Sequence, residues 1–160
     1  MARLFTYFWN KGQFAYYSEN AKSKLLPFTD GNSFLKCQVD FGDFIYIISF
    51  GANESDKREL HVLGRMEVDR IEPRKDSERN IFKEKAIARK PIRLNFKSKI
   101  DVVGIRKLRF CSKLGNNEAK FGKDGRVDKQ TFRNVRELTP YSARVLDAAL
   151  KIKSVASSFE

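Results

Sequence analysis

The order of apolar and polar residues along the chain mostly follows the two-residue period of β-strands. Segments rich in β-branched and aromatic residues predict strands at 2–10, 44–50, 59–71, 92–96 and 102–110. Gly64, inside the third of these strands, predicts a bulge or a bend. Gly42-Asp43 and Asp124-Gly125 predict turns, and the second turn lies in a long polar segment over 112–130.

Helical signals are fewer. We expect short helices at 18–26, capped by Ser18 and stopped by Pro27, and from Asn32 or Ser33 onward. A further helix is expected at 76–88, with Asp76 as its N-cap and Pro91 after its end. The strongest signal is Thr139 as an N-cap followed by Pro140 at the first helical position. An apolar stripe would dock this last helix onto the sheet; its members are Tyr141, Val145, Leu146, Ala149 and Leu150.

Strands and helices alternate irregularly, and no βαβ unit repeats, which is typical of the α+β class. We therefore expect a strongly bent antiparallel sheet or small β-barrel flanked by helices. The 160 residues are enough to bury a core, and no linker or internal repeat divides them, so a single domain over 1–160 is predicted.

Aromatic residues are concentrated in one short segment. The stretch FTYFWNKGQFAYY, residues 5–17, holds seven of the 20 Phe, Tyr and Trp residues of the chain. Phe5 and Phe8 are expected in the core, as is usual for aromatic residues of a strand. Trp9 stands where the strand gives way to a loop, so its ring could belong either to the core or to a pocket that stacks on a flat ligand.

The positive charge is as localised as the aromatic residues. Residues 85–136 carry 16 Lys and Arg against 4 Asp and Glu, whereas acidic and basic residues balance in the rest of the chain. The net charge of +12 of the whole chain therefore comes from this one segment. Positive side chains concentrated in this way repel one another unless a polyanion binds them. A nucleic-acid partner is therefore favoured over the alternative of a basic surface that is only exposed to solvent. A membrane surface is disfavoured because the segment alternates like strands. With no long apolar run and no signal peptide, we expect a cytoplasmic protein.

Residues for catalysis or metal binding are sparse. The chain has one histidine, His61, and two cysteines, Cys37 and Cys111, so no metal site and no cofactor are expected. GxSxG, HExxH and P-loop motifs are absent. A small nuclease using Asp69 and Glu72, or Asp40 and Asp43, is the enzymatic alternative. Binding without catalysis is the favoured interpretation.

Several segments, taken in order, resemble the EVE domain family of the PUA-like superfamily. FGDFIYIIS (41–49) and VLGRMEV (62–68) occupy the places of the family's Gly-Asp turn with its apolar strand and of its "IVGI-x-EV" strand. SFLKCQVDFGD (33–43) is similar to the helix that runs into that turn. VRELTPYSARVLDAAL is similar to the "LREL" segment and final helix near the family's C-terminus.

The resemblance implies a reader of modified bases, 5-methylcytosine among the candidates, in which a base flipped out of DNA enters an aromatic pocket. Combined with the position of the aromatic segment, it predicts a base-binding pocket formed by Trp9, Asn10, Tyr16, Tyr17, Asn32, Ser33 and Phe34. The basic segment supplies the predicted phosphate-binding residues: Arg93, Lys97, Lys99, Arg106, Lys107, Arg109, Arg126, Lys129, Arg133 and Arg136. RNA is the alternative polymer, and a nuclease encoded separately is a possible partner.

Overall fold

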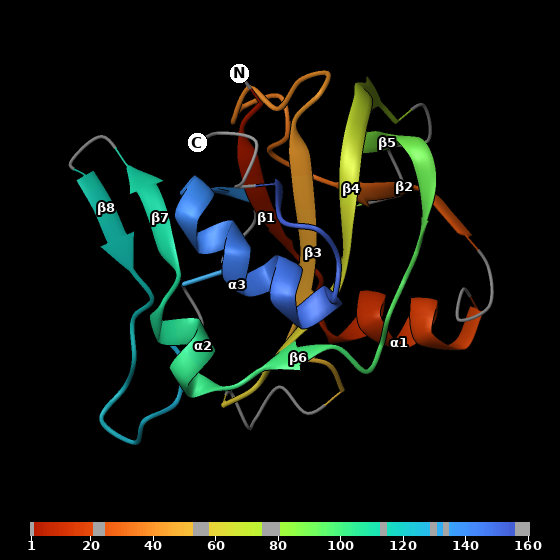
Figure 1. The fold of residues 1–160 in the computed structure, drawn as a ribbon. Helices are drawn as coiled ribbons and strands as arrows, with labels where there is room; N and C mark the ends of the chain where they lie inside the picture. The colour runs from red at the N-terminus through yellow and green to blue at the C-terminus, as the bar shows by residue number, and fades with distance from the viewer. Residues whose placement is uncertain are drawn as a thin grey trace.

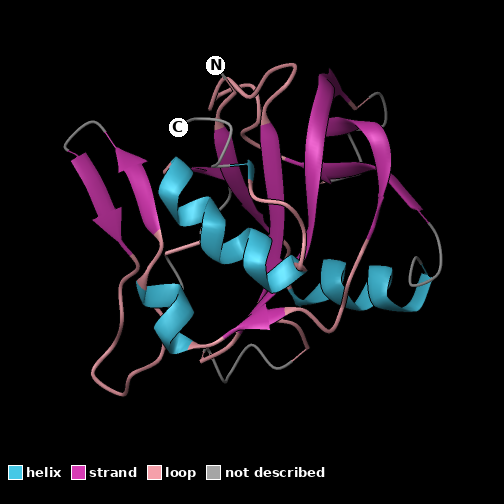
Figure 2. Cartoon of the chain, in the orientation of Figure 1, coloured by secondary structure: helices cyan, strands magenta, loops and turns pink. Residues whose placement is uncertain are grey.

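The computed structural model describes residues 2–20, 25–52, 58–74, 81–112, 115–128, 131–132 and 135–155. Nine strands and three helices lie in these ranges (Figures 1 and 2). In chain order they are β1 (Leu4–Phe8), α1 (Lys11–Asn20), β2 (Leu25–Gly31), β3 (Phe44–Ser49), β4 (Leu60–Pro73), β5 (Glu84–Arg93), β6 (Lys99–Ile100), α2 (Val102–Arg106), β7 (Arg109–Ser112), β8 (Gly115–Glu118), β9 (Val135–Leu138) and α3 (Pro140–Leu150).

The α+β class is confirmed, but the sheet is mixed and open. Its strand order is β2-β5-β4-β3-β1-β9-β7-β8, and β6 pairs separately with β4. β1 and β3 run parallel, with Leu4 opposite Phe44, so the expectation of an antiparallel sheet is wrong at its centre. Since β2 and β8 end the strand order without pairing to each other, the described strands do not close into a barrel.

The central strands separate two hydrophobic cores. Tyr46 and Ile48 of β3 belong to a core that includes Leu146 of α3, which we call the α3 core. The alternate residues Ile45 and Ile47 belong to the second core, the α1 core, which also includes Phe14 of α1 and Leu26 of β2. Because side chains alternate across a strand, the continuous apolar run of β3 supplies both faces. In Figure 1, α3 lies in front of the central strands and β2 runs across their direction.

A bulge in β4 exchanges the two faces of that strand. Ile47 pairs with Gly64 and Ile48 with Val62, which leaves Leu63 as the extra residue. Before the bulge Val62 enters the α3 core, and after it the even-numbered Met66 enters the α1 core. The bulge predicted at Gly64 is confirmed, and its physical effect is to reverse the phase of the side chains.

The last helix is confirmed with its predicted cap. The Thr139 side chain accepts a hydrogen bond from the Ser142 N–H, and Pro140 occupies the first turn. The predicted docking stripe needs correction, because Tyr141 is 75% exposed. The rest of the stripe is confirmed, because Leu146 is buried and Val145, Ala149 and Leu150 pack against the α3 core. Ser142, Ala143 and Asp147 of α3 are also buried.

The predicted helix at 76–88 is wrong over its second half, which forms β5. Ala86 and Ala88 are buried, while Lys85 and Ile87, which alternate with them, are less so, and this is the alternation of a strand. Glu, Lys and Ala favour a helix by propensity, but pairing with β2 and β4 overrides that preference. The first half, with Asp76, lies outside the described residues.

Two other helix boundaries differ from the expectation. The helix predicted at 18–26 begins earlier, at Lys11, and Leu25 and Leu26 already belong to β2. Residues 34–38 form successive turns in place of a second helix. Conversely, the strand predicted at 102–110 starts as α2, because the Asp101 side chain accepts a hydrogen bond from the Gly104 N–H and so caps a short helix.

Candidate functional site

A hollow of about 630 Å³ opens between α1, β2 and residues at both ends of the connection from β4 to β5. We call it the α1 hollow. Three of the residues predicted for a base-binding pocket line it: Asn10, Tyr16 and Tyr17. Its other lining residues are Gly12, Gln13, Asn20, Leu25, Leu26, Pro27, Phe28, Asp30, Arg74, Ile81 and Phe82.

Trp9 supports this hollow from behind and does not line it. Its ring is fully buried, and it stacks on the Tyr17 ring with centroids 4.3 Å apart and an interplanar angle of 19°. Its indole Nε1–H donates to the Thr29 Oγ1 at 3.0 Å. Trp9 is therefore a core residue, the first of the two interpretations of its ring. The aromatic ring that lines the hollow at this point is that of Tyr17.

The sequence around α1 explains why Asn10 and Tyr17 reach the hollow. The Asn10 Oδ1 accepts from the Gln13 N–H at 2.8 Å, and the Gln13 Oε1 accepts from the Asn10 N–H at 3.1 Å. This reciprocal capping box starts the helix directly after β1. Phe14 then faces the α1 core, while Gln13 and Tyr17, on either side of it, line the hollow.

The polar side of the hollow contains an ion pair. The Arg74 Nη1 lies 2.5 Å from the Asp30 Oδ1, and the two side chains are 11% and 20% exposed. Burial raises the pKa of the Tyr17 hydroxyl to about 12, and the Asp30 carboxylate adds to the rise. The Tyr17 phenol is therefore a neutral hydrogen-bonding group near neutral pH. Together these groups offer a carboxylate acceptor, a guanidinium donor and a phenol beside aromatic surface.

Exposed apolar side chains surround the opening. Tyr16 is 60% exposed, Leu25 is 51% exposed and Ile81 is 71% exposed, and all three line the α1 hollow. They are three of the eight large hydrophobic side chains that are exposed in the described part of the chain. Grouped around one concave site, such side chains indicate a binding surface better than they would singly.

The three other predicted pocket residues lie next to the hollow and do not line it. Phe34 is fully buried, with its ring 5.0 Å from that of Tyr7 in an edge-on contact. Ser33 has a positive φ of 72°, and its carbonyl accepts from the Cys37 N–H. Asn32 donates through Nδ2 to the Ile81 carbonyl and accepts at Oδ1 from the Lys83 N–H, both at 2.8 Å. Asn32 thus fixes one wall of the hollow from outside it.

The predicted phosphate-binding residues fall into two groups. The first surrounds α2, β7 and the turn near Phe121, where most of the cations already have partners. The Arg106 guanidinium lies over the Phe121 ring at 4.0 Å, Arg109 pairs with Glu118 at 3.3 Å, and Arg126 pairs with Asp124 at 3.6 Å. Lys107 is exposed beside them. Lys129 and Arg133 lie outside the described residues.

Arg136 belongs to the same region but is turned inward. Its guanidinium lies 4.2 Å from the centre of the Phe110 ring, and its Nη1 donates to the Thr131 carbonyl at 2.5 Å. Burial lowers the pKa of this guanidinium. A side chain held in this way is less available to a phosphate than its charge alone suggests.

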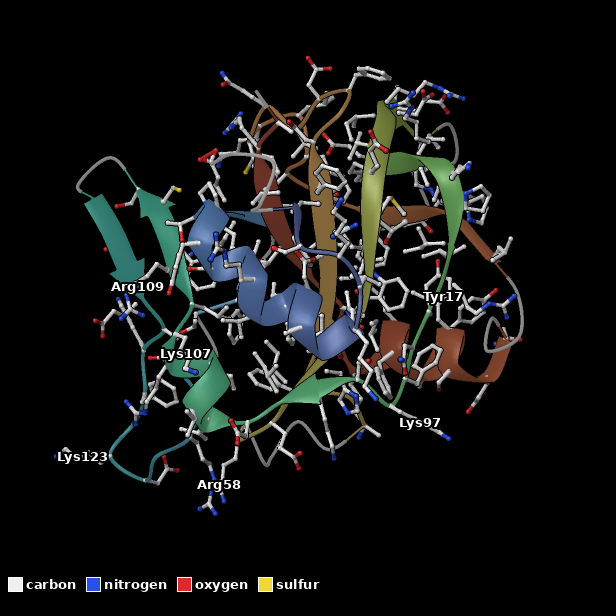
Figure 3. The ribbon with its side chains drawn as sticks, in the orientation of Figure 1. Tyr17, Arg58, Lys97, Lys107, Arg109 and Lys123 are labelled. Atoms are coloured by element: carbon white, nitrogen blue, oxygen red, sulfur yellow. The ribbon has the colours of Figure 1, made fainter. Side chains whose placement is uncertain are left out.

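The second group, Arg93, Lys97 and Lys99, lies on the side of the molecule nearer α1. The Lys99 Nζ pairs with the Glu59 carboxylate at 3.0 Å. Arg93 and Lys97 line a second hollow, of about 440 Å³, between β4, the end of β5 and the end of α3. Figure 3 shows Lys97 on the same side of the view as Tyr17, whereas Lys107, Arg109 and Lys123 lie on the opposite side.

The carboxylates considered for a nuclease have structural partners. Arg70 bridges Asp69 at 2.5 Å and Glu72 at 2.6 Å on the exposed part of β4. The two carboxylate oxygens of Asp43 accept from the backbone N–H groups of Arg3 and Asp40, each at 2.9 Å, and so hold the turn before β3. Within the described ranges, no three His, Cys, Asp or Glu side chains group in a way that could hold a metal ion.

The two cysteines line a third hollow, of about 520 Å³, beside β1, β7 and β9. Both are free thiols, and burial raises the pKa of each. Thiols with raised pKa values are poor nucleophiles near neutral pH. Of the helices that the structure describes, none has the length and apolar character needed to cross a membrane.

Sequence reasoning missed Gln13, Phe28, Asp30, Arg74, Ile81 and Phe82 as residues of the α1 hollow. The Asn-x-x-Gln spacing at 10–13 is a capping-box signal and could have placed Gln13 on the first turn of α1. Asp30 and Arg74 are 44 positions apart, and only the fold brings them together. Searches with this chain match no family model, no curated protein and no solved structure.

Proposed function

We propose that this chain is a nucleic-acid-binding module of the EVE, PUA-like type that accepts a modified base in the α1 hollow while surface cations bind the neighbouring phosphates. The observation that carries the proposal is the composition of the hollow. Aromatic surface backed by the Trp9–Tyr17 stack faces an open site with exposed apolar side chains at its edge. Its volume of about 630 Å³ lies in the usual range for small-ligand sites.

The energetics of base flipping suit such a site. Taking a base out of a duplex costs a few kcal/mol, and stacking on an aromatic side chain returns about 1–3 kcal/mol for each base. The Asp30 carboxylate can accept from an exocyclic amine, and the Arg74 guanidinium can donate to a ring nitrogen or carbonyl. The remaining attraction comes from the net charge of +12, which favours a polyanion without regard to sequence.

DNA is the polymer that we propose, and RNA is the alternative that the same experiment decides. In this proposal the module reads and does not cut, so any cleavage at the recognised site would be carried out by a separate effector, such as a nuclease.

The proposal is tested by measuring binding to matched DNA duplexes and RNAs. One position carries cytosine, 5-methylcytosine, 5-hydroxymethylcytosine, adenine or N6-methyladenine. We expect one modified DNA to bind more tightly than its unmodified counterpart. Tyr16→Ala and Tyr17→Ala should remove about 1–3 kcal/mol of that preference. Tyr141→Ala is the matched control, because Tyr141 is 75% exposed on α3 and does not line the hollow.

A thermal melt of each variant separates lost binding from lost folding. Tyr16 is 60% exposed, so Tyr16→Ala should leave the melting temperature nearly unchanged even if Tyr17→Ala lowers it. Equal affinity of the wild-type protein for every modified and unmodified polymer would refute base reading. If only the modified RNAs bind more tightly than their unmodified counterparts, RNA and not DNA is the partner.

A further inference from the structure

The hollow next to the proposed base site has the charge of an anion-binding groove. We call this second hollow, of about 440 Å³, the β5 hollow. Three cationic side chains line it, Arg65, Arg93 and Lys97, and no carboxylate is among its lining residues. Its floor is apolar where Ile92, Leu94 and Phe96 contribute to it. A site of this composition favours a phosphate joined to a less polar group over a free, strongly hydrated ion.

Two of its cations are available and the third is held. The Arg65 Nη1 donates to the Asp147 Oδ1 and to the Lys153 carbonyl, both at 2.9 Å. Arg93 and Lys97 are exposed, and within the described part of the chain no ion pair engages either side chain. This distinguishes them from Arg109, Arg126 and Lys99, which have carboxylate partners.

The two hollows adjoin across one pair of strands. Leu25 and Leu26 of β2 line the α1 hollow, and their partners in β5, Arg93 and Ile92, line the β5 hollow. Directly paired residues of antiparallel strands have Cα atoms about 4.5–5.5 Å apart. The helix that carries Tyr17 also reaches the β5 hollow, because the Phe14 ring of α1 lies 5.5 Å from the ring of Phe96, which lines that hollow.

We infer that the β5 hollow binds the sugar-phosphate group adjacent to the base in the α1 hollow, through Arg93 and Lys97. The nucleic-acid strand then crosses the Leu25–Arg93 pair. This inference rests on the proposed function and adds a direction to it. The nucleic-acid strand runs from the base site toward β5 and the end of α3, and so leads away from the cations around α2 and β7. Lys97 projects on the Tyr17 side of the molecule (Figure 3), as this path requires.

The test compares two double variants that change the net charge equally. Arg93→Gln with Lys97→Gln removes the two exposed cations of the β5 hollow and keeps Arg65, and Lys120→Gln with Lys123→Gln neutralises two exposed lysines of the segment after β8. In Figure 3 Lys123 lies far from Tyr17. The probes are nine-nucleotide single strands of DNA and RNA with a central cytosine, 5-methylcytosine, 5-hydroxymethylcytosine or N6-methyladenine. The corresponding free nucleosides, which carry no phosphate, are measured beside them.

We expect the β5-hollow variant to weaken binding of the best oligonucleotide and to flatten its log–log salt dependence by about 1.4 units, since each phosphate contact to a single strand contributes about 0.7. The control variant should change the slope by less than half of this. Binding of the free nucleoside should be the same in both variants, because a nucleoside has no phosphate to lose.

Two results would overturn the inference while the proposed function stands. In the first result, nucleosides and oligonucleotides bind the wild type and Tyr17→Ala abolishes this binding, but Arg93→Gln with Lys97→Gln leaves it unchanged. The other is an equal loss of slope in both double variants, which would mean that general charge and not this hollow binds the phosphates. If neither nucleosides nor oligonucleotides bind the wild-type chain, the proposed function and the inference both fail.

Discussion

The two faces of the central strands are covered in different ways. On the α3 face, a buried carboxylate with three hydrogen-bond partners fixes the helix to the sheet. The Asp147 carboxylate accepts from the Tyr46 hydroxyl at 2.7 Å, from Arg65 at 2.9 Å and from the Val155 N–H at 3.0 Å. On the α1 face the cover is incomplete, and the α1 hollow remains between α1, β2 and the residues after β4.

The difference separates packing for stability from packing for a preformed site. On the α3 face, side chains fill the interface and a hydrogen-bonded carboxylate joins α3 to β3 and β4. On the α1 face, several residues that do not all line the hollow hold its lining residues in place. Trp9 supports Tyr17, Asn32 holds Ile81, and Gln13 caps the helix that carries Tyr17. Supporting contacts of this kind keep a concave surface open without a ligand.

Removal of the support behind the hollow should have the largest effect. Trp9→Ala should lower the free energy of unfolding by about 3–5 kcal/mol, because loss of a fully buried indole leaves a cavity and removes the hydrogen bond that the Thr29 Oγ1 accepts. Trp9→Phe keeps a ring against Tyr17 and loses the hydrogen bond, so it should cost about 1–2 kcal/mol. Urea unfolding measures both. A loss below 1 kcal/mol in Trp9→Ala would contradict the buried position.

On the opposite face, Leu146→Ala should destabilise the protein by about 2–5 kcal/mol, since Leu146 is fully buried in the α3 core. Tyr141→Ala, one turn earlier on the same helix, should change stability by less than about 0.5 kcal/mol because its side chain is exposed. Chemical denaturation of the two variants compares them directly. Similar losses in both variants would show that Tyr141 also packs against the sheet.

Alkaline pH should reveal a tyrosine of the α1 core. Burial raises the pKa of Tyr7 from 10.0 to about 12. The stability that the neutral phenol contributes is complete below pH 10 and is lost as the pH rises through 12, because the unfolded chain ionises first. At about 1.4 kcal/mol per pKa unit, this amounts to about 2–3 kcal/mol.

Tyr7→Phe should remove that part of the pH dependence while leaving stability below pH 9 nearly unchanged. Unfolding curves of the wild type and the variant between pH 9 and 12 provide the measurement. Lysine ionisation affects both proteins alike and cancels in the difference. Parallel losses of stability in the two proteins would show that Tyr7 does not contribute.

The smallest effects on stability should come from the edge of the hollow. Ile81→Ala and Tyr141→Ala remove side chains of similar exposure, 71% and 75%, so each should shift stability by less than about 0.5 kcal/mol. Only Ile81 lines the α1 hollow, so only Ile81→Ala should weaken ligand binding. Calorimetric melts with a titration of the best oligonucleotide test the pair. Equal binding by both variants would show that the exposed side chain of Ile81 does not contribute to ligand binding.

The parts of the fold that the sequence predicted have local causes. The apolar run of β3 and the Thr139-Pro140 start of α3 carry their signals within a few residues. β5 was missed because Ala86 and Ala88 gain their burial only from pairing with distant strands. Propensity alone cannot report a contact of that kind.

The site was predicted in the same partial way. The aromatic segment identified Tyr16 and Tyr17, but the same composition could not tell the exposed rings from the buried Trp9 and Phe34. The difference arises because α1 starts at Lys11 and turns successive residues to different sides. The Asp30–Arg74 pair depends on the path of β2 past the end of β4, which no local pattern records.

The bulge at Leu63 has a consequence for how this protein can change in length. The strand serves one core before the bulge and the other core after it, so its phase depends on the number of residues as well as on their character. If β4 lost the bulge while keeping Leu63, strict alternation from Val62 would turn Met66 and Val68 toward α3 and Arg65 toward the α1 core, whereas deletion of Leu63 would leave these residues opposite their present partners in β3. Replacement of a side chain in β4 is therefore a local event, and the loss of one residue is tolerated by the pairing with β3 only at the bulge, because anywhere else it would turn one part of the strand to the opposite face.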